Sequence, residues 1–277
     1  MQKRNKWIAN CNKIQLCRYT IIIMEILHFL IACIAALFAG FVNAIAGGGT
    51  LITFPILLVL GVSPVTANIT NTVALTPGIL GGVYAQRRDL KSQKRTLLTI
   101  LPISILGGIL GGLILLYTNE NSFRAIIPYL ILIAATLLAL QTPVKNWVAS
   151  RTSNESLETS GKLGMFVLFF LAALYGGYFG AGLGVILMAV LGLVIDDSFT
   201  RLNVLKQAIS FSINFAATLF FCFTGRVNWP FAIIMACGAI IGGMLGGKFA
   251  GKIKPNTLKW IVVSVGATVA IIFFLKQ

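Results

Sequence analysis

The sequence predicts an all-α polytopic membrane protein, built from two inverted-topology repeats with glycine-broken helices and crossing the membrane in about 8–10 segments. Three observations predict this fold class: apolar runs of spanning length, a glycine-pair motif that recurs, and a bias of basic loops that reverses between the halves. Of the 277 residues, 57% are hydrophobic and only 10% are charged, and the mean hydropathy is +0.92. This composition is typical of a bundle of membrane spans and exceeds what a soluble core needs.

Most of the expected helices are apolar runs of about 20 residues, long enough to cross about 30 Å of hydrocarbon. In chain order these runs cover 21–42, 96–117, 123–141, 163–181, 205–223, 230–250 and 257–275. Three further runs, 51–62, 66–84 and 184–195, are shorter or more polar. The first run is too long, and is followed by too many others, to be a cleaved signal peptide.

A glycine-pair motif indicates an internal repeat. The stretch Leu106–Gly112 recurs as Ile241–Gly247, an offset of 242 minus 107, or 135 residues. The same offset lays Ala46, Gly47 and Gly49 on Ala181, Gly182 and Gly184, and it lays Asn68 on Asn203. The paired glycines form small-xxx-small stripes, which we interpret as internal helix packing, with a dimer face as the alternative.

The repeat divides the chain into four parts. We expect a basic N-terminal tail over 1–24, a first transmembrane repeat over 25–141, a polar cytoplasmic linker over 142–162 and a second repeat over 163–277. Because Met24 directly precedes Glu25 and the first apolar run, we also expect residues 1–23 to lie upstream of the natural start.

The basic loops predict opposite orientations for the two repeats. In the first half the positive charges gather before the glycine-pair helix, at Arg87, Arg88, Lys91, Lys94 and Arg95. In the second half they follow it, at Lys248, Lys252, Lys254 and Lys259. Since Lys and Arg mark cytoplasmic ends, the repeat is expected to be inverted. Inversion needs an odd number of crossings per half, so each short helix should cross, giving ten segments with both termini outside. The basic tail favours the alternative, a first short helix that re-enters the membrane.

The glycine-rich breaks are the first candidate binding elements. Three glycines, Gly47 to Gly49, lie between the candidates Asn43 and Thr50. The counterpart is Gly180 to Gly184, with Gly182 and Gly184 as candidates. Backbone leaves a helix at bilayer depth only where it faces protein or a water-filled cavity. The N–H groups and positive dipole at the start of the next helix attract an anion. The alternative is a structural kink.

The polar helix after each break supplies the other candidates. Asn68, Asn71 and Thr72 share one helical face, as do Asn203, Lys206, Gln207 and Ser210. Amides at this depth either bind a ligand or bond neighbouring helices. Lys206 is the basic residue on this face, and we interpret it as a substrate-facing cation, with a side chain snorkelling to the interface as the alternative.

Several chemistries lack the residues they need. All seven acids fall in loops or at segment ends, so no buried carboxylate is available as a proton or sodium relay. The single histidine, His28, and the five scattered cysteines form no metal site and no catalytic triad. We therefore expect no enzyme, no metal and no cofactor. The net charge of +15 is assigned to membrane topology and not to nucleic acid.

Two stretches, Gly40–Pro55 and Ala67–Gly78, resemble the first-module motif of the TauE/SafE family of sulfite and sulfonate exporters, and the resemblance spans about 25–275. It implies a multi-pass permease of the inner or plasma membrane for sulfite, an organosulfonate or a related sulfur-containing or organic anion. The partners are then a small anionic substrate and the lipid bilayer, with homo-oligomerisation left open. The alternatives are a non-transporting assembly or scaffold protein and an anion channel.

Overall fold

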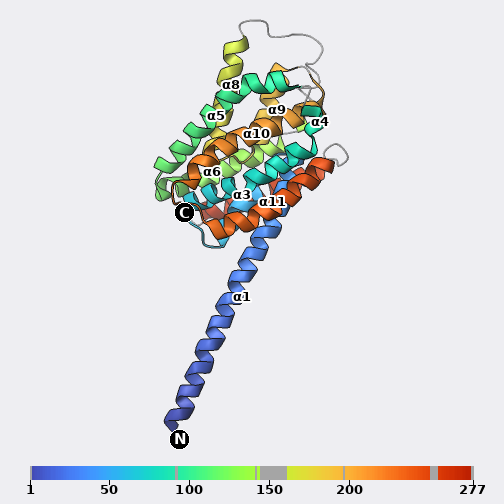
Figure 1. Ribbon diagram of the computed structural model, residues 1–277. Helices are drawn as coiled ribbons and strands as arrows, with labels where there is room; N and C mark the ends of the chain where they lie inside the picture. The colour runs from blue at the N-terminus through green and yellow to red at the C-terminus, as the bar shows by residue number, and fades with distance from the viewer. Residues whose placement is uncertain are drawn as a thin grey trace.

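The computed structural model describes residues 2–90, 93–140, 142–143, 161–195, 197–249 and 255–275. Over these ranges the chain is a bundle of helices without a strand, from which the first half of α1 projects (Figure 1). The helices are α1 (Gln2–Ile45), α2 (Thr50–Val59), α3 (Pro64–Ala85), α4 (Arg87–Leu90), α5 (Lys94–Tyr117), α6 (Glu120–Ala139), α8 (Gly161–Tyr178), α9 (Leu183–Val194), α10 (Phe199–Cys222), α11 (Trp229–Phe249) and α12 (Pro255–Leu275).

The predicted membrane spans are confirmed as helices. Five segments are long and apolar enough to cross a bilayer: Ile22–Ile45, Lys94–Tyr117, Glu120–Ala139, Thr200–Cys222 and Trp229–Phe249. The chain is therefore a multi-pass membrane protein. The 22-residue α3 is not among these five, and most of its side chains are buried within the bundle.

The structure does not test most of the predicted boundaries between the tail, the two repeats and the linker. The helix α1 continues without interruption across residues 24 and 25, so the expected tail and the first span form one helix. Of the expected linker over 142–162, residues 144–160 lie outside the described residues.

The first glycine break folds α1 and α2 into a helical hairpin. A Cβ atom at Gly49 would collide with the carbonyl oxygen of Ala39, so the chain turns back beside α1 after residue 45. At its far end Glu120 accepts hydrogen bonds from Ser63 Oγ at 3.0 Å and from Val65 N at 3.1 Å, which fixes this end of the hairpin to the start of α6. The short helix α2 thus runs back beside α1 instead of continuing the direction of α1.

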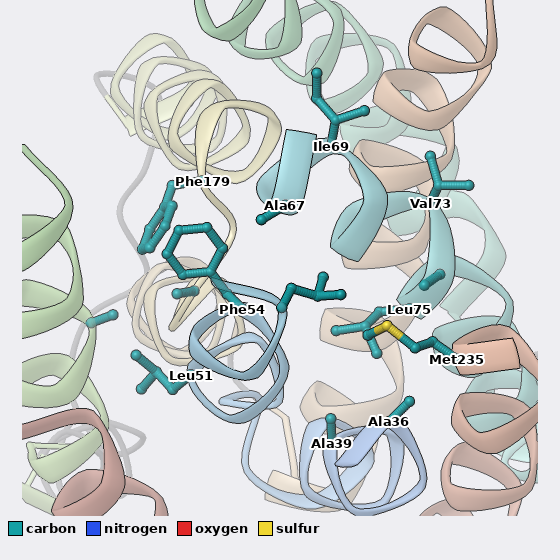
Figure 2. Packing of buried hydrophobic residues seen from close by; sticks show 14 of the residues in the cluster. Ala36, Ala39, Leu51, Phe54, Ala67, Ile69, Val73, Leu75, Phe179 and Met235 are labelled. Atoms are coloured by element: carbon teal, nitrogen blue, oxygen red, sulfur yellow. The ribbon is translucent and has the colours of Figure 1, made fainter. Parts of the chain in front are cut away.

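The second break builds an equivalent hairpin from α8 and α9. The hydroxyl of Tyr175 donates to the carbonyl of Ala181 at 2.6 Å and holds its turn. The aromatic ring of Phe179, in this turn, meets Phe54 of α2 edge-on with ring centroids 5.3 Å apart (Figure 2). The two hairpins therefore pack against each other in the core.

The glycine pairs confirm the prediction of internal packing. On α11, a Cβ at Gly242 or Gly246 would strike the backbone of α1 at Leu37 or Phe41. On α5, a Cβ at Gly111 would strike α8 at Leu174. Without side chains at these positions the helix backbones approach closely, and dispersion contacts replace the hydrophobic effect that lipid cannot supply.

The helices α3 and α10 run antiparallel through the centre of the bundle. Thr76 bonds Thr218 at 3.0 Å, whereas Gln86, ten residues later, accepts from Asn203, fifteen residues earlier. The first helix of each repeat also packs against the glycine-pair helix of the other repeat: α1 against α11, and α8 against α5. The inverted repeat stays a prediction, and this arrangement supports it.

The predicted register of the two breaks is wrong by two residues. Gly47 N and Gly180 N each bond the carbonyl five residues earlier, at Val42 and Tyr175, and both glycines have positive φ, +86° and +73°. The offset at the breaks is thus 180 minus 47, or 133, instead of 135. The 12-residue α9 is two residues longer than the 10-residue α2, and this difference restores the offset of 135 at Asn68 and Asn203.

One helix interface of the bundle is partly open at the surface. An apolar groove of about 510 Å³ separates part of α5 from α10 and is lined by Ile105, Phe211, Phe215 and Leu219 among others. At the corresponding interface of α3 with α11, Gly78 and Gly243 bring the two backbones into contact. At the equivalent positions of α5 and α10, Gly108 and Ile213, the two backbones also approach closely, so the groove lies beside a close helix contact.

We predict that Gly108→Val lowers the yield and thermal stability of folded protein in detergent. A Cβ at Gly108 would lie 2.7 Å from the carbonyl oxygen of Ile213, and overpacking of this kind costs about 1–3 kcal/mol. Gly164→Val is the control, because this helical glycine has no neighbour within 4 Å. Equal melting temperatures for the two variants would contradict the packing account.

We predict opposite sidedness for the two ends of α5. In a cysteine-free background, a membrane-impermeant maleimide applied to intact cells should label Asn121→Cys and spare Arg95→Cys, because basic residues mark the cytoplasmic side. Both positions are exposed in the structure, so reactivity should report the compartment. Labelling of Arg95→Cys before permeabilisation would rule out the predicted orientation.

Candidate functional site

The candidate site is a small cavity at the tips of the two hairpins. It has two adjoining parts of about 20 and 10 Å³, each large enough for about one water molecule. Both parts are bounded by Asn43, Ile79, Gly184 and Ser210. The cavity lies between the middle turns of α3 and α10, near the middle of the bundle, and in this conformation it is too small for a polyatomic anion.

The hairpin tips touch at two glycines. A Cβ added to Gly47 would lie 2.7 Å from the Cα of Gly184, and one added to Gly184 would lie the same distance from the Cα of Gly47. Gly47 also has φ of +86°, a conformation that glycine adopts without steric cost. The contact therefore requires glycine on both sides, and it forms part of the cavity wall.

Several positive groups border the cavity. The N-terminal residues of α2 and α9, Thr50 and Leu183, both line it, so the positive ends of two helix dipoles are directed at one place. The side chain of Lys206 lines the smaller part. Amide and hydroxyl groups complete the wall at Asn43 and Ser210. This combination favours a small anion that also accepts and donates hydrogen bonds.

Lys206 is a core residue and not an interfacial one. Only 2% of its surface is exposed, and its ammonium donates to Asn203 Oδ1 at 2.7 Å. Within the part of the chain that the structure describes, no carboxylate pairs with Lys206, whereas Arg201, about one turn earlier, pairs with Asp197 at 3.3 Å. A buried ammonium without a counter-ion favours binding of an anion.

Asn68 and Asn203 hold the ends of the broken helices. Asn68 Nδ2 donates to the carbonyl of Tyr178, the last residue of α8, at 2.7 Å. Asn203 Nδ2 donates to the carbonyl of Ala44, in the last turn of α1, at 3.4 Å. Each polar helix thus satisfies a carbonyl where the broken helix of the other repeat ends, which buried backbone requires.

The structure gathers eight of the predicted site residues around the cavity: Asn43, Gly47, Thr50, Thr72, Gly184, Lys206, Gln207 and Ser210. It places the other six outside the cavity wall: Gly48, Gly49, Asn68, Asn71, Gly182 and Asn203. A Cβ at Gly48 would point at the side chain of Leu138, and one at Gly182 would point at Ala134, both in α6. These two glycines therefore face α6.

Six lining residues are not in the predicted set of site residues: Ala44, Leu75, Ile79, Gly180, Leu183 and Asn214. Asn214 lies one turn after Ser210 on the same helical face, and Gly180 follows from the offset of 133, so both carried a usable signal. Leu75 and Ile79 are equivalent to Ser210 and Asn214 at the offset of 135 and carried no polar signal. One wall of the cavity is therefore apolar and the opposite wall is polar.

Among the described residues, no three or more His, Cys, Asp or Glu side chains form a group that could hold a metal ion.

Comparison with known proteins gives a consistent result. The family model described as "Sulfite exporter TauE/SafE" matches residues 32–273. A "Probable membrane transporter protein" of Haemophilus influenzae is 32% identical over 220 residues, covering 79% of this chain and 84% of that protein. "Probable membrane transporter protein ORF9" of a Sinorhizobium species is 27% identical over 249 residues, covering 86% and 89%. "Probable membrane transporter protein YfcA" of Escherichia coli K12 is 24% identical over 239 residues, covering 85% of each chain. No solved structure matches the chain.

We predict that Gly47→Ala destabilises the protein more than Gly61→Ala. Both glycines have φ of +86°, so both variants pay the cost of a left-handed residue, about 1–2 kcal/mol. Gly61 has no neighbour within 4 Å, whereas Gly47 meets the backbone of Gly184. Thermal unfolding of the two purified variants isolates the tip contact, which should add about 1–3 kcal/mol. If the two melting temperatures fall equally, the tips do not depend on this contact.

Proposed function

The chain belongs to the TauE/SafE family, and we propose that it is a secondary transporter that carries a small anion across the cell membrane. The family description and the names of the relatives support transport, and the chemistry of the cavity supports an anion. The observation that carries the proposal is the convergence of two helix N-termini and the buried Lys206 on one cavity between the repeats.

The substrate class follows from the shape and polarity of the wall. Oxygens of a small oxoanion would accept from the Lys206 ammonium and from backbone N–H groups at the start of α2 and α9. The side-chain amides of Asn43 and Asn214 and the hydroxyl of Ser210 offer further donors. The apolar face at Leu75 and Ile79 would accommodate a short organic group. We therefore propose sulfite, a small organosulfonate or a related sulfur-containing or organic anion.

The hairpins provide a mechanism for access from each side in turn. Each hairpin tip ends at the cavity. The contact between Gly47 and Gly184 closes the cavity between the two tips. Withdrawal of one hairpin would open a path along that side, while the other hairpin keeps the opposite path closed. An anion between the tips would neutralise Lys206, so that substrate binding favours the closed arrangement. This is alternating access around a fixed site near the bilayer centre.

The direct test is flux into proteoliposomes containing the purified protein. Sulfite, sulfate, thiosulfate, short sulfonates and short carboxylates form the panel. A transporter should give flux that saturates with the concentration of at least one of these anions. Flux that rises linearly without saturation would support an anion channel, and the absence of flux for the whole panel would support a non-transporting scaffold.

We predict that Lys206→Gln raises the half-saturating substrate concentration about 10-fold or more. The change keeps length and hydrogen bonding but removes the charge, and a charge-assisted hydrogen bond is worth about 1.5–3 kcal/mol. Lys248→Gln, at an exposed position in the last turn of α11, is the control and should leave the affinity unchanged. An unchanged affinity in Lys206→Gln would remove this residue from the proposed site.

A further inference from the structure

Asn68 and Asn203 each donate Nδ2 to the end of a broken helix, but their Oδ1 atoms differ in their partners. Each donates its Nδ2 to a carbonyl in the last turn of the opposite broken helix, α8 for Asn68 and α1 for Asn203. The two residues are also equivalent in sequence, at the offset of 135. Their Oδ1 atoms therefore occupy corresponding places in the two halves, next to corresponding helix ends.

In the second half a cation fills this place. The ammonium of Lys206 lies 2.7 Å from Asn203 Oδ1 and is buried beside the end of α1. The C-terminal end of a helix carries a negative partial charge, so it favours a cation in this position. The positive charge is thus held by an amide oxygen and a helix end without a carboxylate.

In the first half the corresponding place contains two amide oxygens without a donor. The residue equivalent to Lys206 is Asn71, at 206 minus 135. Asn68 and Asn71 are each 1% exposed, and their Oδ1 atoms have no hydrogen-bond partner in the described structure. They lie about one turn apart on the same face of α3, and Asn68 binds the final carbonyl of α8. Buried acceptors without a donor are rare in native proteins, so two on one face indicate a ligand.

We propose that Asn68 and Asn71 bind a sodium ion at the end of α8, in the place that the Lys206 ammonium takes in the second half. Amide and carbonyl oxygens are suitable ligands for a hard cation, and the C-terminal ends of broken helices coordinate Na⁺ in membrane transporters. A water molecule would also donate to two oxygens. The cation is favoured because the equivalent group is itself a cation and because the adjacent helix end is negative.

Sodium at this position would couple to the anion site, and this part of the inference rests on the proposed function. The ion would fix the end of α8, and the turn that follows supplies Gly180, Leu183 and Gly184 to the cavity wall. Sodium binding would therefore order the second hairpin tip and raise the affinity for the anion.

The test of the site itself needs no substrate. Purified protein is melted in buffers of constant ionic strength in which choline chloride is replaced stepwise by NaCl, and a parallel series uses KCl. The melting temperature should rise with NaCl and saturate, with a smaller response to KCl. Equal responses to Na⁺, K⁺ and choline would overturn the sodium site and leave the two oxygens to ordered water.

Two variants of Asn71 sharpen the test. Asn71→Leu removes the acceptor at similar volume and should abolish the sodium response, or weaken the apparent sodium affinity at least 10-fold, while the protein remains folded. Asn71→Lys copies the second half and should make the melting temperature independent of sodium. Thr76→Val is the matched control, because Thr76 is a buried polar residue of α3 whose hydroxyl is already bonded to Thr72 and Thr218. A full sodium response in Asn71→Leu would overturn the proposal.

The two proposals fail separately. A saturable sodium response without flux of any anion in the panel would support this site and overturn the transport function. Flux of an anion with the same rate and affinity in Na⁺ and in choline would overturn the coupling, whatever the melting data show.

Discussion

The structure depends on one constraint, that a backbone which leaves the helix inside a bilayer must find partners for its polar groups within the protein. Two chain reversals at this depth leave the last carbonyls of α1 and α8 without helical partners. The amides of Asn203 and Asn68 supply donors to them, each from the opposite repeat. This exchange binds the halves to each other at the point where both are broken, and it places α3 and α10 at the centre of the bundle despite their polarity.

The glycine stripes make this central arrangement attainable. Polar helices reach the middle of a membrane bundle only when apolar helices enclose them, and close enclosure requires small residues at the crossing points. Gly243 and Gly247 of α11 lie against Gly78 and Gly82 of α3, while other glycines of α11 lie against α1. The same helix thus joins an outer, lipid-facing element to an inner, polar one. The glycines far from the cavity allow the apolar helices to enclose α3 and α10, and the amides near the cavity bond the ends of the broken helices.

Much of the fold could be predicted from the sequence, because the signals are local. Hydropathy located most of the long helices to within a few residues, although α1 begins at Gln2 and not near residue 21, and the polar face of Lys206, Gln207 and Ser210 indicated the cavity wall. The predictions that were wrong concern positions whose surroundings are set by other parts of the chain. Whether Gly48 faces a ligand or α6 is set by the rotation of a short tip, which its own sequence does not encode. The register of the breaks failed because two extra residues lie in the uniformly apolar α9, where an insertion leaves no signal. The apolar wall at Leu75 and Ile79 could not be separated from ordinary core.

The groove between α5 and α10 leaves an apolar part of this helix pair without a protein neighbour. The two helices touch where Gly108 meets the backbone of Ile213, and Phe211, Phe215 and Leu219 line the space beside this contact. Phe215 and Leu219 are exposed. In a membrane protein such a surface is solvated by acyl chains, so the fatty-acid composition of the bilayer acts on the packing of α10, the helix that carries Lys206.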